Sequence, residues 1–152
     1  MKKILIYGYG NPGRQDDGLG AALVEMLEQW AHENKIENVD FDTNYQLNIE
    51  DALTISEYDT VVFADATIEE DVKDFLFDEL KPSRAIIEFT MHASSPGYIL
   101  DLCHKMYNKN PEAWLMHIKG YEWELKEGVT EKANANLIKS VAQLKKWISE
   151  RK

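Results

Sequence analysis

Three side chains that can ligate a metal each follow an apolar, strand-like run of the sequence. Asp17 lies in the loop after the first such run, Asp65 ends a later run, and His92 directly follows another. A carboxylate at the end of a buried strand must be solvated in a cleft or hold a partner, because burying it unpaired is costly. Carboxylate and imidazole groups suit divalent transition metals such as nickel and zinc. Asp17, Asp65 and His92 are therefore predicted to form a transition-metal site.

The loop before Asp17 contains a glycine pattern that suggests a different chemistry. Residues 8–13 read G-x-G-x-x-G, a pattern found in dinucleotide-binding loops. Such loops bring pyrophosphate to the positive end of a helix, where Asp16 and Asp17 would repel it, and no Lys-Ser or Lys-Thr pair follows the glycines. The two acids also have a structural explanation, because one of them could be a helix N-cap. The position of Asp65 favours a cation site instead.

The remaining histidines and the single cysteine are predicted to be mainly structural. His32 lies at a predicted helix end, where the helix dipole favours a cation, and His104 adjoins Cys103 on another predicted helix. Adjacent helical side chains diverge, so Cys103 and His104 do not form a nucleophile–base pair, and Cys103 is expected to be a small buried hydrophobe. His117 lies in the strand-like run Leu115–Ile118 and is the one further histidine that could line the site.

Apolar segments with strand-like and helix-like periods alternate along the chain, which predicts an α/β fold. The pattern is typical of a three-layer αβα arrangement with about five mostly parallel strands, flavodoxin-like or phosphorylase/hydrolase-like in appearance. In such sheets ligands bind beyond the carboxyl ends of the strands, where Asp17 and Asp65 would face each other if the first and third strands are neighbours. The acidic segment from residue 69 to residue 79 is expected to be a solvated face. Strands are predicted at residues 3–8, 39–43, 60–64, 85–91 and 115–118, and helices at 18–27, 48–56, 96–107 and 130–149.

Length and composition limit the class of protein. The 152 residues are expected to form a single domain over 1–152, with a balance of 44% hydrophobic and 29% charged residues. A formal net charge of −10 disfavours nucleic acid as a partner. No apolar run approaches the roughly 20 residues that span a bilayer. The absence of a signal-peptide pattern and the single cysteine lead us to expect a cytoplasmic protein.

Taken together, these motifs resemble the hydrogenase maturation endopeptidases. The resemblance rests on Gly8-Tyr9-Gly10-Asn11, then Asp16-Asp17-Gly18-Leu19-Gly20, then Asp65-Ala66 at the end of an apolar strand, then His92. It extends over residues 3–100, and the closing Gly120-Tyr121-Glu122 with a final amphipathic helix is also similar. The segment from Thr67 to Pro82 departs from the family, in which a Gly-Gly or Pro-Gly stretch commonly follows the Asp-Ala pair.

The resemblance implies that Asp17, Asp65 and His92 engage nickel that the substrate presents and that is not a resident cofactor. The substrate would be the precursor of a nickel-iron hydrogenase large subunit, from which the enzyme cuts a C-terminal extension. Nickel near the scissile peptide could polarise the carbonyl or activate water, with Asp17 or Asp65 as the catalytic base. The protein is expected to act as a monomer without a membrane or nucleic-acid partner.

Two other functions fit part of the sequence. The opening glycine loop also resembles that of bacterial peptidyl-tRNA hydrolases, but the Arg-His-Asn group that follows it in that family is absent here. A non-catalytic metal-binding assembly module would keep the same three ligands and need no hydrolysis.

Overall fold

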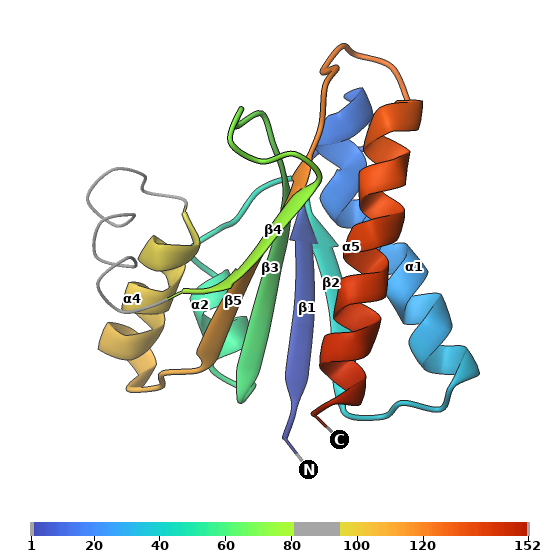
Figure 1. The fold of residues 1–152 in the computed structure, drawn as a ribbon. Helices are drawn as coiled ribbons and strands as arrows, with labels where there is room; N and C mark the ends of the chain where they lie inside the picture. Colours follow the sequence, from blue (N-terminus) through green and yellow to red (C-terminus); the bar gives the residue numbers. More distant parts are fainter. Residues whose placement is uncertain (1, 81–94, 152) are drawn as a thin grey trace.

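The structure is a computed structural model that describes residues 2–80 and 95–151. Strands and helices alternate along most of the chain, and the sheet forms the middle layer (Figure 1). The described part of the chain contains no helix that is both long and apolar enough to cross a membrane. The elements are β1 Ile4–Tyr9, the 3-10 turn η1 Gln15–Gly18, α1 Leu19–Glu33, β2 Val39–Asn44, α2 Asp51–Ile55, β3 Thr60–Thr67, β4 Phe75–Glu79, α4 Pro96–Tyr107, β5 Glu112–Lys119 and α5 Glu131–Ser149.

The strands of the described residues form one sheet in the order β2-β1-β3-β5-β4. The pairs β1–β2, β1–β3 and β3–β5 are parallel, and β4 runs antiparallel to β5 at the edge. The predicted α/β class, the mostly parallel sheet and the neighbouring first and third strands are therefore confirmed. The predicted strand at 85–91 lies outside the described residues.

Strand β4 corrects the expectation that residues 69–79 form only a solvated face. Phe75 and Phe77 pack against the core, whereas the alternate residues Leu76 and Asp78 are exposed. The ring of Phe77 stacks on Trp114 with centroids 4.9 Å apart. Contacts of the Phe77 ring with Trp114 and Trp147 and the hydrogen-bond ladder to β5 thus hold a segment whose charge suggested full solvation.

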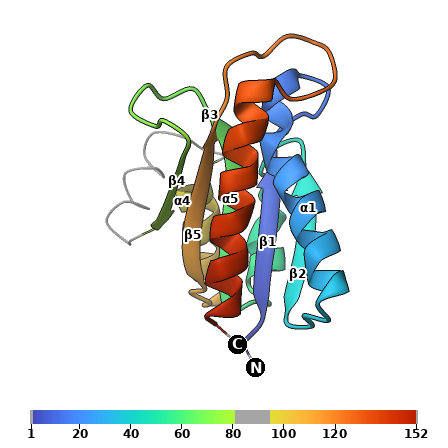
Figure 2. The ribbon, with the colours of Figure 1, turned by 45° about the vertical axis from the view of Figure 1, so that its right-hand side comes forward.

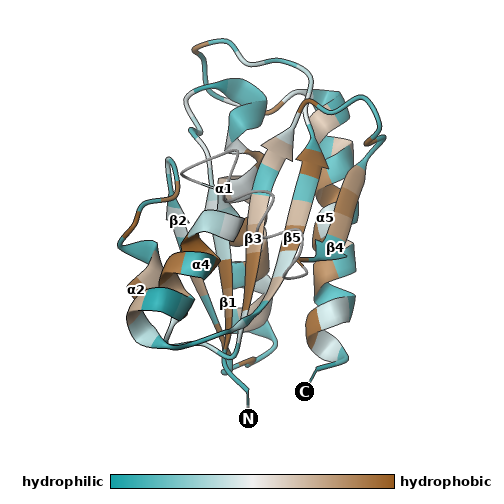
Figure 3. Cartoon of the chain, turned by 90° about the vertical axis from the view of Figure 1, so that its left-hand side faces the viewer, coloured by the Kyte–Doolittle hydropathy of each residue, from teal (hydrophilic) through white to brown (hydrophobic). Residues whose placement is uncertain are grey.

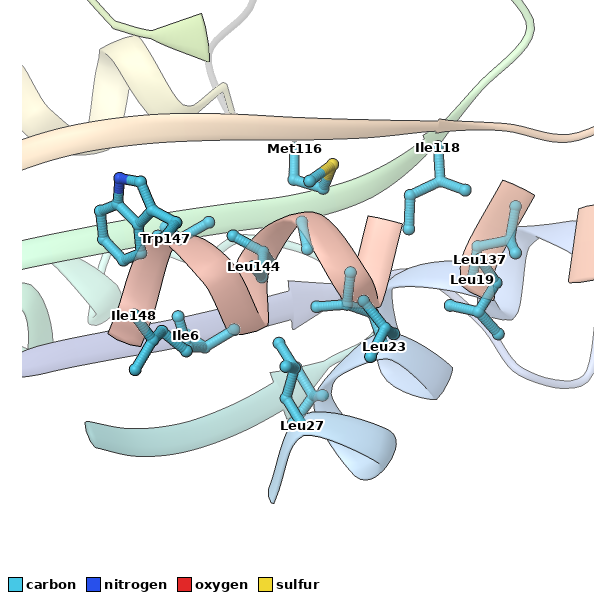
Figure 4. Close-up of a cluster of buried hydrophobic side chains, with 14 of the residues drawn as sticks. Ile6, Leu19, Leu23, Leu27, Met116, Ile118, Leu137, Leu144, Trp147 and Ile148 are labelled. Carbon is cyan, nitrogen blue, oxygen red and sulfur yellow. The ribbon is translucent and has the colours of Figure 1, made fainter. Parts of the chain in front are cut away.

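Two apolar layers hold the helices on the sheet. The first lies under α1 and α5, where Figure 4 shows Leu23 and Leu27 of α1 and Leu144 of α5 directed toward strand side chains such as Ile6. The second lies under α2 and α4 (Figure 3) and contains alternate strand residues, among them Tyr7, Phe63 and Leu115. The three central strands, β1, β3 and β5, therefore supply both layers, and the carboxyl ends of the parallel strands lie at the same end of the sheet.

Helix α1 begins very close to the sheet because Gly20 has no side chain. A Cβ at Gly20 would lie 2.6 Å from the carbonyl oxygen of Ala64 and 2.8 Å from that of Tyr9. Real Cβ atoms do not approach backbone oxygens so closely, so this position requires glycine. The close approach places the turn before α1 beside the carboxyl ends of β1 and β3.

Candidate functional site

Asp17 lies in η1, at the carboxyl end of β1. Its Oδ2 accepts a hydrogen bond of 2.7 Å from the backbone N–H of Asn11 in the preceding loop. Gly10 makes this fold of the loop possible: it has φ of +132°, and a Cβ there would lie 2.1 Å from the carbonyl oxygen of Asp17. Only glycine adopts that conformation at little cost. The glycine loop therefore cradles an acidic side chain.

Asp65 lies near the end of β3, the strand that pairs with β1. Its Oδ1 accepts a hydrogen bond of 2.8 Å from the N–H of Ala66. The pKa of Asp65 is raised to about 7, chiefly because burial disfavours the charged form. The Ala66 hydrogen bond lowers the pKa, and the nearby negative charge of Asp17 raises it. The two carboxylates therefore lie within electrostatic reach of each other at the strand ends, as predicted.

The donor chemistry of this pair fits a divalent cation. One oxygen of each carboxylate is fixed by a backbone N–H, through Asn11 for Asp17 and through Ala66 for Asp65. Within residues 2–80 and 95–151, no hydrogen-bond donor engages the other oxygen, Oδ1 of Asp17 or Oδ2 of Asp65. A cation held between them would relieve the repulsion that contributes to the raised pKa of Asp65.

The described residues do not contain a complete metal site. Within them no group of three or more His, Cys, Asp or Glu side chains is placed to hold a metal ion. His92, the third predicted ligand, lies outside the described residues. The role of His92 therefore stays a prediction. Of the three predicted ligands, the described structure places Asp17 and Asp65 near each other.

His117 lies beside Asp65 at the carboxyl ends of the parallel strands. It is the partner of Asp65 in the parallel register between β3 and β5. Phe63 and Leu115, two positions earlier on the same strands, both belong to the layer under α2 and α4, so Asp65 and His117 share that face of the sheet. The possibility that His117 lines the site is thus supported by register. His117 lies beside Asp65 because β3 pairs with β5, and strand pairing cannot be predicted from the periodicity of the sequence.

Asp16 and Asp17 make different contacts. The explanation that one of them is a helix N-cap is wrong. Gly18 occupies the N-cap of α1 and Arg14 that of η1, without a side-chain cap in either case. The Asp16 side chain is fully buried. It accepts hydrogen bonds from backbone and hydroxyl groups of the β5–α5 loop and of Thr130 at the start of α5. No local pattern predicted that the two neighbouring acids would bind different parts of the chain.

The residues predicted to be structural lie away from the two carboxylates. His32 is in the last turn of α1 and His104 in the last turn of α4, where the helix dipole favours a cation. Cys103 is fully buried, and burial raises the pKa of its thiol. A thiol of this kind is a poor nucleophile, in agreement with its predicted packing role.

Comparison with known proteins shows which fold this is. No family model matches the chain, and no curated protein matches it in sequence. Among solved structures, the hydrogenase maturating endopeptidase HybD from E. coli is similar with a TM-score of 0.74 and 21% identity, over 98% of this chain and 93% of that one. The [NiFe] hydrogenase maturation protease HybD from Thermococcus kodakarensis has a TM-score of 0.69 and 18% identity, over 95% and 98% of the two chains.

A third similar structure is the [NiFe] hydrogenase maturation protease HycI from Thermococcus kodakarensis KOD1, with a TM-score of 0.66 and 20% identity over 94% of this chain and 90% of that one. The chain therefore has the fold of the hydrogenase maturation endopeptidases, and it covers nearly the whole length of each of these proteins. The resemblance expected from the motifs is confirmed at the level of the fold.

Proposed function

We propose that this protein is an endopeptidase that removes the C-terminal extension from the nickel-loaded large subunit of a nickel-iron hydrogenase. The pair of carboxylates, Asp17 and Asp65, at the carboxyl edge of the sheet is the observation that carries the proposal. Each offers one oxygen without a hydrogen-bond donor among the described residues. The shared fold with proteins named as hydrogenase maturation endopeptidases supports the same function.

Nickel belongs to the substrate in this proposal. Asp17 and Asp65, with His92, engage the ion in the precursor and so bring the scissile peptide to the edge of the sheet. Nickel can polarise the peptide carbonyl or lower the pKa of an attacking water. A carboxylate with a pKa near neutral, such as Asp65, is suited to accept a proton from that water. The protein is proposed to work as a monomer.

Cleavage of a purified precursor tests this function. Wild-type protein is expected to shorten a nickel-loaded precursor and to leave a nickel-free one intact, with the products followed by mass spectrometry. Asp17→Asn and Asp65→Asn should slow cleavage at least about a hundredfold, because each removes a charged group from the site. His92→Ala should do the same if it is the third ligand.

Asp71→Asn is a matched control, since it removes the same charge from an exposed acid. Equal cleavage by the wild type and by both carboxylate variants would contradict the assignment of the site. An intact precursor after incubation with folded wild-type protein that binds the metal would instead favour the assembly module. The tRNA-hydrolase alternative gains no support from a net charge of −10.

A further inference from the structure

Asp16 makes an unusually complete set of hydrogen bonds for a residue next to a proposed metal ligand. Its Oδ2 accepts from the N–H groups of Tyr121 at 2.8 Å and Glu122 at 3.1 Å, and from the hydroxyl of Thr130 at 2.9 Å. Its Oδ1 accepts from the N–H of Thr130 at 2.7 Å. Both oxygens are thus engaged, so Asp16 is not free to bind a cation.

These bonds fasten η1 to the loop between β5 and α5. The backbone adds two more links, from the N–H of Asp16 to the carbonyl of Glu122 at 3.0 Å and from the N–H of Gln15 to that of Lys126 at 2.9 Å. In Figure 2 this loop arches over the same end of the molecule as the segment before α1. Gly120 leaves room for the contact, because a Cβ there would lie 2.7 Å from the Cβ of Asp16.

The turn that carries Asp17 has little stability of its own. It is four residues long, lacks a side-chain cap, and contains Gln15 with φ of +47°, a conformation that non-glycine residues seldom adopt. External contacts must therefore hold it. Asp16 supplies them from one side, and the Asn11 N–H holds Asp17 itself from the other.

We propose that Asp16 is a positioning residue: through its bonds to the 121–130 segment it fixes η1 so that the carboxylate of Asp17 faces Asp65 and the metal. The inference rests on the proposed function, because it takes the cation to be the target of Asp17. It assigns different roles to two adjacent aspartates, one buried and fully hydrogen-bonded, the other open to the ligand. Groups that orient a metal ligand in this way typically change metal affinity by 10–100-fold when removed.

Cadmium binding by calorimetry, together with the ¹¹³Cd NMR shift of the bound ion, tests the inference without any proteolysis. Asp16→Asn keeps the shape but replaces one acceptor oxygen with a donor that faces the donors of Tyr121 and Thr130. We expect its cadmium affinity to fall about tenfold or more, with a changed ¹¹³Cd shift. The control Asp71→Asn should keep both wild-type values.

Two variants of Thr130 test the positioning role of Asp16 if Asp16→Asn does not fold. Thr130→Ala removes one of the four bonds to Asp16, whereas Thr130→Ser keeps the hydroxyl that donates to Asp16 and caps α5. Affinity should fall several-fold in Thr130→Ala, and Thr130→Ser should restore it. To separate this effect from the lost cap, Ala133→Gly in the first turn of α5 should weaken the helix without changing the ¹¹³Cd shift.

Cadmium binding distinguishes failure of the positioning role of Asp16 from failure of the metal site itself. If the wild type binds cadmium and the folded Asp16→Asn variant binds it equally well with the same ¹¹³Cd shift, Asp16 is only a structural anchor and the inference is overturned. Equal binding by Thr130→Ala and Thr130→Ser has the same meaning. If the wild type itself binds no cadmium, the metal site of the proposed function fails, and the positioning role fails with it.

Discussion

Asp65 combines a partly buried carboxyl with an acidic neighbour, so its protonation should be visible in the stability of the protein. An unfolded aspartate has a pKa of about 3.9, whereas the pKa of Asp65 is raised to about 7. Between these values the folded chain binds a proton that the unfolded chain has released. The free energy of unfolding contributed by this group is therefore fully present below about pH 4 and is lost as pH rises through about 7.

Asp65→Asn should remove this dependence. We expect the variant to gain stability relative to the wild type as pH rises from about 5 to about 8, because the neutral amide never has to ionise. Urea unfolding at both pH values measures the difference. A stability difference that does not change with pH would show that Asp65 titrates normally. Asp71→Asn, at an exposed site, should show no such trend.

At the level of single residues, the sequence predicted which acids form the proposed site, but it did not predict the different contacts of Asp16 and Asp17. Asp17 and Asp65 were predicted because each follows an apolar strand, and local patterns contain that information. Asp16 has the same local pattern as Asp17. Its partners lie more than one hundred positions later, at Tyr121, Glu122 and Thr130, so only the folded chain reveals its role.

Helix α1 depends on Gly20 for its position on the sheet, which gives a prediction about this element. Gly20→Ala should lower the free energy of unfolding by about 1–3 kcal/mol, since the added methyl meets two backbone oxygens that side-chain rotation cannot move. Glu28→Ala on the exposed face of the same helix should change it by less than about 0.5 kcal/mol. Thermal unfolding followed by circular dichroism compares the two variants. An unaltered Gly20→Ala protein would mean that α1 can shift freely.

Elements with a clear hydrophobic period could be predicted from the sequence, whereas the edge strand β4 could not. The closing helix, with apolar residues at intervals of three and four, was predicted at 130–149 and is observed as Glu131–Ser149. The segment of β4 has only five residues, and its stretch of chain is acidic. Its strand conformation depends on pairing with β5 and on the ring of Trp114, neither of which is encoded locally.

The C-terminal helix is joined to the far edge of the sheet by an aromatic cluster. The ring of Trp147 lies edge-on to Phe77 and Trp114, with centroids 5.8 Å away in both cases. The guanidinium of Arg151 lies 4.3 Å over the Trp147 ring and pairs with Glu112 at 2.6 Å. The cluster therefore links α5 to the adjacent strands β4 and β5.

Trp147→Ala should destabilise the whole domain by about 3–5 kcal/mol, as expected for the loss of a large buried ring. Trp147→Phe should cost less than about 1.5 kcal/mol. The smaller ring keeps the apolar contacts, and it removes an indole N–H that has no hydrogen-bond partner among the described residues. Urea unfolding measures both variants. Equal losses in the two would mean that a phenyl ring cannot replace the indole ring in this packing.

The link between Asp16 and the segment before α5 also has a consequence for biosynthesis. Asp17 and Asp65 lie in the first half of the chain and are synthesised early. The donors that hold η1 lie 105 to 114 positions after Asp16 and are therefore synthesised much later. Domains fold as the chain emerges from the N-terminus, and contacts over such separations form slowly. A nascent chain that stops short of Tyr121 carries both acids without the bonds that fix their geometry. The chain would thus fix the geometry of its proposed site only near the end of its own synthesis.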